Sequence, residues 1–219
     1  TLIFGIPLLL ISFLFARKNS LRGTFALTGV SGYFLVTYLF YMCMGMYNQL
    51  FLIYVALTSL SFFTFLLTIL SIDVENVRSC FREKLPVGFI GGFLIFNSIA
   101  IAFLWLSIIV PPLIDGTLYP AAVQHYTTLI VQGMDLSLLL PFSFVIGFLL
   151  IKKKPFGYLF APVYLIFLSL LMTALVAKII GMSLTGVSAG PAVVIIPVFD
   201  LITIGCAIVI LKASENKKS

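Results

Sequence analysis

Long apolar stretches alternate with short polar turns along almost the whole chain. Each stretch has about 20 residues, the length of a helix that crosses the hydrocarbon core of a membrane. Because lipid offers no hydrogen-bond partner to an open backbone, such stretches must form helices. We predict a single all-α, polytopic integral membrane domain over residues 1–219 with seven transmembrane helices. The expected ranges of these helices are 1–16, 24–46, 50–72, 87–114, 125–151, 156–182 and 192–211.

The composition agrees with this pattern. The chain is 62% hydrophobic and 9% charged, with a mean hydropathy of +1.23, which excludes an ordinary soluble domain. The formal net charge of +6 could suggest a nucleic-acid partner. The basic residues fall in short turns between apolar stretches, however, so we interpret the charge as a signal of membrane topology. The expected partner is the lipid bilayer, with no nucleic acid.

The basic residues occur in every second connection, which predicts the orientation. The positive-inside rule then places the N-terminus outside and the C-terminus in the cytoplasm. We expect a multi-pass protein of a cell membrane, the inner or plasma membrane of a prokaryote. The chain begins at Thr1 within an apolar stretch, so we expect further residues upstream. The basic connections contain Arg17, Lys18 and Arg22, then Arg78, Arg82 and Lys84, then Lys152 to Lys154, and finally Lys212, Lys217 and Lys218.

A polar stripe interrupts the fifth apolar stretch. His125, Thr128, Gln132 and Asp135 are spaced three and four residues apart, which places them on one face of a helix. Asp135 lies roughly 24 Å from the cytoplasmic end of that helix at about 1.5 Å per residue. Polar groups within a bilayer usually face protein or water. The stripe therefore predicts one wall of a pocket that opens to the outer side.

Other spans offer groups that could complete this pocket. We expect Tyr41 and Asn48, on one stripe of the second span, to orient a ligand together with Gln132. Asp200 lies about 13 Å into the last span from the outer side. Lys178, near the outer end of the sixth span, is the single cation within reach of either carboxylate. Two carboxylates and one ammonium leave a negative site, which a proton or a cation would balance.

Each of these residues also has a structural interpretation, which the sequence leaves open. Asp135 and Lys178 could form an ion pair between neighbouring spans. His125 could lie at the water interface, where its ordinary protonation range fits. The tyrosines could serve in helix packing, with their hydroxyls bonded to a neighbour. A proline near Asp200 could bend its helix without creating a site.

An internal repeat is weakly visible in the sequence. Residues 7–23 contain the end of one span, a basic turn and the start of the next span, and residues 141–157 contain the same features at equal spacing. Both segments run from a proline to a glycine. This pattern would suit two parallel three-helix units joined by one helix, which is a known transporter plan. Two unrelated apolar hairpins with basic turns would also match to some degree.

Two longer stretches of the sequence have a distinctive pattern. The first is RKNSLRG, followed by Gly32-Tyr33, Tyr38, Tyr41 and YNQLFLIYVAL; the second is VQGMDLSLLLP, followed by KKKPFGYLFAP. Together they resemble a family of uncharacterised prokaryotic multi-spanning membrane proteins. The resemblance implies no activity, because none is known for the family. It implies that Gln132, Asp135, Pro141, Gly157 and Tyr158 belong to a recurring pattern.

The sequence shows no catalytic or metal motif. It lacks HExxH, a Gly-rich phosphate loop and a nucleophile elbow, and its three cysteines have no metal or redox spacing. We predict binding or transport of a small polar or cationic solute or of protons. The first alternative is a non-transporting sensor or a subunit of a membrane complex with a protein partner. The second is an intramembrane enzyme or a haem protein. The sequence itself identifies no cofactor.

Overall fold

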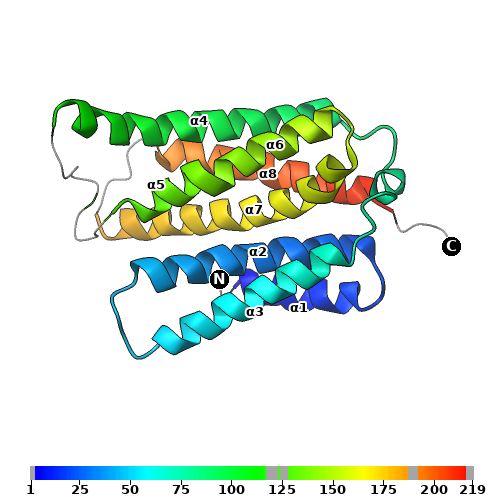
Figure 1. The fold of residues 1–219 in the computed structure, drawn as a ribbon, viewed down its shortest axis with the longest axis horizontal. Helices are drawn as coiled ribbons and strands as arrows, with labels where there is room; N and C mark the ends of the chain where they lie inside the picture. Colours follow the sequence, from blue (N-terminus) through cyan, green and yellow to red (C-terminus); the bar gives the residue numbers. More distant parts are fainter. Residues whose placement is uncertain (1–2, 117–122, 124–127, 187–191, 216–219) are drawn as a thin grey trace.

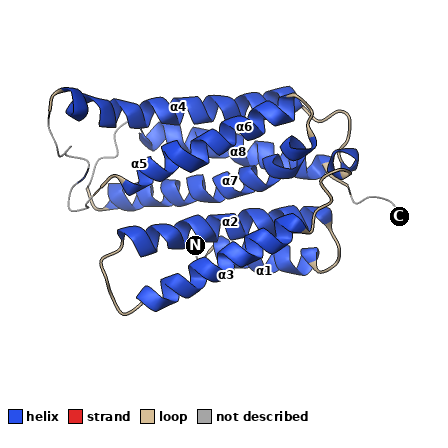
Figure 2. Cartoon of the chain, in the orientation of Figure 1, coloured by secondary structure: helices blue, strands red, loops and turns tan. Residues whose placement is uncertain are grey.

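The computed structural model describes residues 3–116, 123, 128–186 and 192–215, and within these ranges the regular structure is helical (Figure 2). Residues 71–86, which connect two of the long helices, contain a short 3-10 turn. The elements are α1 (Gly5–Ala16), α2 (Leu21–Met44), α3 (Phe51–Leu70), η1 (Val77–Cys80), α4 (Val87–Ile114), α5 (Ile130–Met134), η3 (Asp135–Leu139), α6 (Leu140–Ile151), α7 (Pro155–Leu184) and α8 (Ala192–Ala213).

Six of the described helices are long and apolar enough to cross a membrane, and they make this chain an integral membrane protein. One of the six is the continuous segment of α5, η3 and α6, from Ile130 to Ile151. The helix α1 is apolar but has only 12 residues. At about 1.5 Å per residue it is roughly 18 Å long, which is shorter than a hydrocarbon core of about 30 Å. The prediction of a seventh span is therefore not confirmed and stays a prediction.

Local sequence explains where several helices begin. α2 begins at Leu21 rather than at Thr24, because the Ser20 hydroxyl accepts a hydrogen bond from the Gly23 N–H (3.3 Å) and caps the helix. Pro155 opens α7, where its missing N–H costs nothing. The fifth span begins at Ile130 rather than at His125, which lies outside the described residues.

The helices α2 and α7 form the centre of the molecule. α2 packs against α1, α3 and α7, whereas α7 packs against α2, α6 and α8; α4 covers α6 (Figure 1). In the 18-residue apolar segment of each helix that could span the membrane, 50% is buried for α2 and 44% for α7, compared with 6% for α3. The hydrophobic core therefore follows these two central helices, and α3 leaves most of its apolar surface for lipid.

The turn between α1 and α2 has the same backbone conformation as the turn between α6 and α7. A constant shift of 134 residues (19 to 153, 23 to 157) relates the two turns. Asn19 and Lys153 both have a φ of 54°, and their N–H groups donate to the Ala16 and Leu150 carbonyls at 2.9 Å. The similarity between residues 7–23 and 141–157 in the sequence therefore extends to the backbone of these two turns.

Glycine lets both hairpins close tightly. A Cβ atom on Gly23 would lie 2.6 Å from the Ala16 nitrogen, and one on Gly157 would lie 2.4 Å from the Leu150 nitrogen. We refer to α1–α3 as the first half of the chain and to α5–α8 as the second half. α2 and α7 approach each other closely at Gly29, where a Cβ atom would lie 2.7 Å from the Val163 carbonyl oxygen of α7. Gly29 and Val163 are also related by the shift of 134 (29 to 163).

One end of the bundle carries the basic turns and is fastened by hydrogen bonds (the right side of Figure 1). The Arg22 guanidinium donates to the Ser214 and Lys212 carbonyls at 2.8 and 3.2 Å, at the C-terminus of α8. The Arg82 N–H donates to the Ala213 carbonyl at 3.0 Å, and the Arg82 side chain forms an ion pair with Glu215. Unpaired carbonyls at a helix C-terminus attract cations, which explains the position of Arg22.

Candidate functional site

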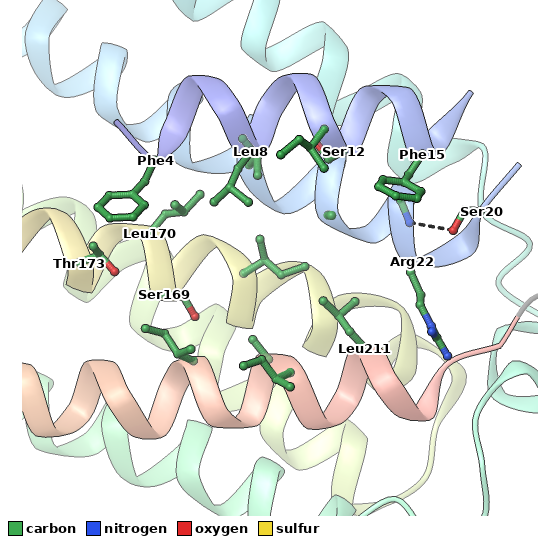
Figure 3. Close-up of a pocket in the computed structure, with 18 of the residues that line it drawn as sticks. Phe4, Leu8, Ser12, Phe15, Ser20, Arg22, Ser169, Leu170, Thr173 and Leu211 are labelled. Carbon is green, nitrogen blue, oxygen red and sulfur yellow. Dashed lines mark hydrogen bonds between the residues drawn. The ribbon is translucent and has the colours of Figure 1, made fainter. Parts of the chain in front are cut away.

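A cavity of about 770 Å³ lies between α1, α2, α7 and α8 (Figure 3). In Figure 3, Leu8 and Ser12 of α1 line one side, Leu211 of α8 lines the other, and Ser169, Leu170 and Thr173 of α7 lie between them. The lining is mostly apolar. Its polar members are Ser12, Ser20, Arg22, Ser169, Thr173 and Asp200. We call this space the α1–α8 groove.

Asp200 is the acidic residue of the groove. Asp200 is 7% exposed, and its two carboxylate oxygens lie 3.2 and 3.4 Å from the Thr173 hydroxyl, which donates to them. No lysine or arginine among the described residues lies within ion-pair distance of Asp200. A carboxylate that is buried beside a neutral hydroxyl lacks the countercharge that buried charges normally have. A cation or a proton would supply it.

Apart from Thr173, the other polar groups of the groove have backbone partners. The Ser12 hydroxyl donates to the Leu9 carbonyl at 3.0 Å, and the Ser169 hydroxyl donates to the Leu165 carbonyl at 2.7 Å. Arg22 lies at the basic end of the groove, where it binds the carbonyls that end α8. Asp200 is therefore the charged group of the groove that has no charged or backbone partner in the described part of the chain.

Asp135 lies elsewhere, at the start of the π-helical turn η3. Its carboxylate accepts a hydrogen bond from the Trp105 indole N–H of α4 at 2.8 Å. The Leu140 N–H donates to the Asp135 carbonyl, which gives the wider π-type ring. Pro141 follows immediately and has no N–H to donate, which favours a local break in the α-helical bonding. Turns of this kind occur often at functional sites.

Two carbonyls near this turn bond to neighbouring helices. The Ser98 hydroxyl of α4 donates to the Leu140 carbonyl at 2.6 Å, and the Tyr164 hydroxyl of α7 donates to the Leu139 carbonyl at 3.0 Å. The Ser143 hydroxyl donates to the Leu94 carbonyl at 3.2 Å. These bonds link α4, α6 and α7 around the π-helical turn. Asn97 of α4 is 1% exposed, and its Oδ1 atom has no hydrogen-bond partner in the described part of the chain.

The structure does not bring the residues of the expected outer pocket together. Lys178 is exposed on α7, and it forms no ion pair with Asp135 or with any other described carboxylate. Instead of Lys178, the indole of Trp105 serves as the partner of Asp135. Asp200 lines the α1–α8 groove, whereas Asp135 of η3 lies beside α4.

The remaining expected residues have local partners or lie apart. Asn48 closes the turn between α2 and α3, because its amide donates to the Met46 carbonyl (2.9 Å) and its oxygen accepts from the Leu50 N–H (2.8 Å). Tyr41 is 52% exposed, and its ring contacts those of Tyr38 and Tyr54. Gln132 is half-buried and Thr128 is exposed, while His125 lies outside the described residues.

Sequence reasoning missed Thr173 and Tyr164. Both lie on α7, where the sequence pointed to Lys178 as the candidate site residue. Thr173 is one of many hydroxyl residues in apolar helices, and such residues usually bond their own backbone. Only the packing of α7 against α8 shows that its hydroxyl faces Asp200. Tyr164 is 4% exposed, and no pattern in the sequence marks the carbonyl that it reaches.

No family model matches the chain, and neither a curated protein nor a solved structure matches it. Among the described residues, no group of three or more His, Cys, Asp or Glu side chains could hold a metal ion. Function is therefore inferred from the geometry of the site.

Proposed function

We propose that this protein binds a small cationic solute or protons at Asp200 and carries them across the membrane. The observation that supports the proposal is the Asp200 carboxylate, which is buried in the α1–α8 groove beside Thr173 and has no described cationic partner. A carboxylate within a membrane protein is costly and marks ion, proton or substrate paths. The mostly apolar lining of the groove favours a cation with apolar substituents over a strongly hydrated one.

Three further predictions belong to this proposal. We retain the seventh span, the orientation with the C-terminus in the cytoplasm, and the location in a cell membrane. The gathering of basic turns at one end of the bundle supports the orientation. The duplicated turns and the contact between α2 and α7 at matching positions support a parallel two-unit transporter plan.

Reconstituted liposomes test the proposal. We expect the protein to bind tetraphenylphosphonium, an apolar monovalent cation, and to support either its uptake or proton flux. We expect Asp200→Asn to weaken binding about tenfold or more, since loss of one charged contact costs about 1.5–3 kcal/mol. Asp135→Asn serves as the matched control, because it removes the same charge outside the groove.

Circular dichroism and size-exclusion chromatography would show that both variants are folded. Binding and flux that are unchanged in Asp200→Asn would refute the proposal. Equal losses in Asp200→Asn and Asp135→Asn would also count against the groove as the site.

A further inference from the structure

A second cavity, of about 720 Å³, lies at the basic end of the bundle, away from Asp200. It is formed by the connection between α3 and α4 together with the turn between α6 and α7. Phe81, Leu85, Val87 and Tyr158 provide its apolar and aromatic wall. Its charged members carry both signs and are Arg78, Arg82 and Lys153 with Glu75 and Glu83. We call this space the basic-end cavity.

Two of its cations are available for a ligand. Arg82 forms an ion pair with Glu215, whereas Arg78 and Lys153 have no ion-pair partner in the described part of the chain. Three of the apolar members, Phe81, Leu85 and Tyr158, are less than a tenth exposed. The cavity therefore combines a buried apolar wall with the Arg78 guanidinium, the Lys153 ammonium and two glutamate carboxylates.

Lys153 has a backbone conformation that lysine rarely adopts. Its φ of 54° lies in the left-handed region, where asparagine and glycine are the residues that are accepted most readily. The matching position of the first turn carries Asn19 at the same φ. A lysine in this backbone conformation points to a role for its side chain. Lys153 lines the basic-end cavity, which is where that role would be performed.

We propose that the basic-end cavity binds the headgroup of a phospholipid that carries N–H or O–H donors, such as an ethanolamine or glycerol headgroup. Arg78 and Lys153 bind the phosphate, and Glu75 and Glu83 accept hydrogen bonds from the ammonium or the hydroxyls. A choline headgroup has no such donors and fits the carboxylates less well. Basic pockets at the ends of membrane helices are suited to phospholipid headgroups. This inference does not depend on Asp200.

Native mass spectrometry of the purified full chain in detergent tests the inference. We expect phosphatidylethanolamine and phosphatidylglycerol each to bind about tenfold tighter than phosphatidylcholine, the equivalent of about one charge-assisted hydrogen bond. We expect Lys153→Asn to weaken both about tenfold. Lys154→Asn is the matched control, because Lys154 has the same charge one residue away and does not line the cavity. It should leave both affinities unchanged.

Thermal unfolding separates binding from folding. Asparagine suits the backbone of position 153, so Lys153→Asn should unfold at the same temperature as the unaltered protein or higher. Equal binding of phosphatidylcholine would overturn the inference, as would equal losses in Lys153→Asn and Lys154→Asn. Displacement of the lipid by soluble glycerophosphoethanolamine at comparable concentration would overturn the assignment to a lipid.

Discussion

The hairpin of α1 and α2 and the hairpin of α6 and α7 share one backbone design but differ in chemistry. Both have a residue at a φ of 54° and a glycine pressed against the preceding helix. The second half also carries Asp200 with Thr173, and Asp135, whose partner Trp105 lies on α4. In the first half, the Tyr41 ring contacts the rings of Tyr38 and Tyr54. The two turns therefore share a backbone conformation, whereas Asp135 and Asp200 both lie in the second half.

The tight glycines test the shared design and should give the largest effects. Gly157→Ala would place a Cβ atom 2.4 Å from the Leu150 nitrogen, and Gly23→Ala one 2.6 Å from the Ala16 nitrogen. Because the neighbouring atoms are backbone, they cannot move aside. We expect each substitution to destabilise the protein by about 3 kcal/mol, at the upper end for overpacking. Thermal unfolding in detergent measures the change.

Gly92→Ala is the control for this pair. A Cβ atom on Gly92 would have no neighbour within 4 Å, and alanine favours a helix. We expect no loss of stability from it. If Gly157→Ala were as stable as Gly92→Ala, the close contact in the second turn would not exist.

The contact between the halves can be tested in the same way, with a smaller expected effect. Gly29→Ala would bring a Cβ atom within 2.7 Å of the Val163 carbonyl oxygen and the Ile166 Cβ atom. We expect a loss of about 2 kcal/mol, because α2 and α7 would have to separate slightly. Gly32→Ala, three residues along α2, meets its nearest atom at 3.5 Å and should be tolerated. Thermal unfolding of both variants distinguishes a close contact between the halves from a loose one.

Much of the fold follows from the sequence because the bilayer leaves few choices. Runs of apolar residues and basic turns predicted the positions of the long helices, for example Val87–Ile114. The similarity between the two hairpins is marked in the sequence by Pro7 and Gly23 and by Pro141 and Gly157, together with the basic turns between them. Prolines and glycines mark it because they reflect backbone constraints, whereas apolar residues are interchangeable in lipid-facing helices. The candidate site could be predicted less well from the sequence. Whether Asp135 faces Lys178 or Trp105 depends on which helices are neighbours, and helical spacing within one span cannot show that.

The hydrogen bond between Trp105 of α4 and Asp135 tests the acidic chemistry of the second half. Trp105→Phe keeps an aromatic ring of similar shape but removes the indole donor at 2.8 Å from the carboxylate. We expect a loss of about 1.5–3 kcal/mol, the usual contribution of a hydrogen bond to a charged group. Asp135→Asn retains an acceptor and should lose less. Unfolding temperatures of the two variants measure the difference, and a larger loss in Asp135→Asn would argue against a hydrogen-bonding role for Trp105.

An exchange at the two left-handed positions should give the smallest effect, with opposite signs in the two halves. Asn19→Lys places a long side chain where a φ of 54° disfavours it, and we expect a loss of about 1 kcal/mol. Lys153→Asn should give a gain of about the same size for the same reason. The double variant should then have nearly the stability of the unaltered protein, because the two positions lie in separate turns and their effects should add. Denaturant or thermal unfolding of all three variants provides the measurement. If both single variants lost stability, the two turns would not be equivalent, and the shared φ would have separate causes in each half.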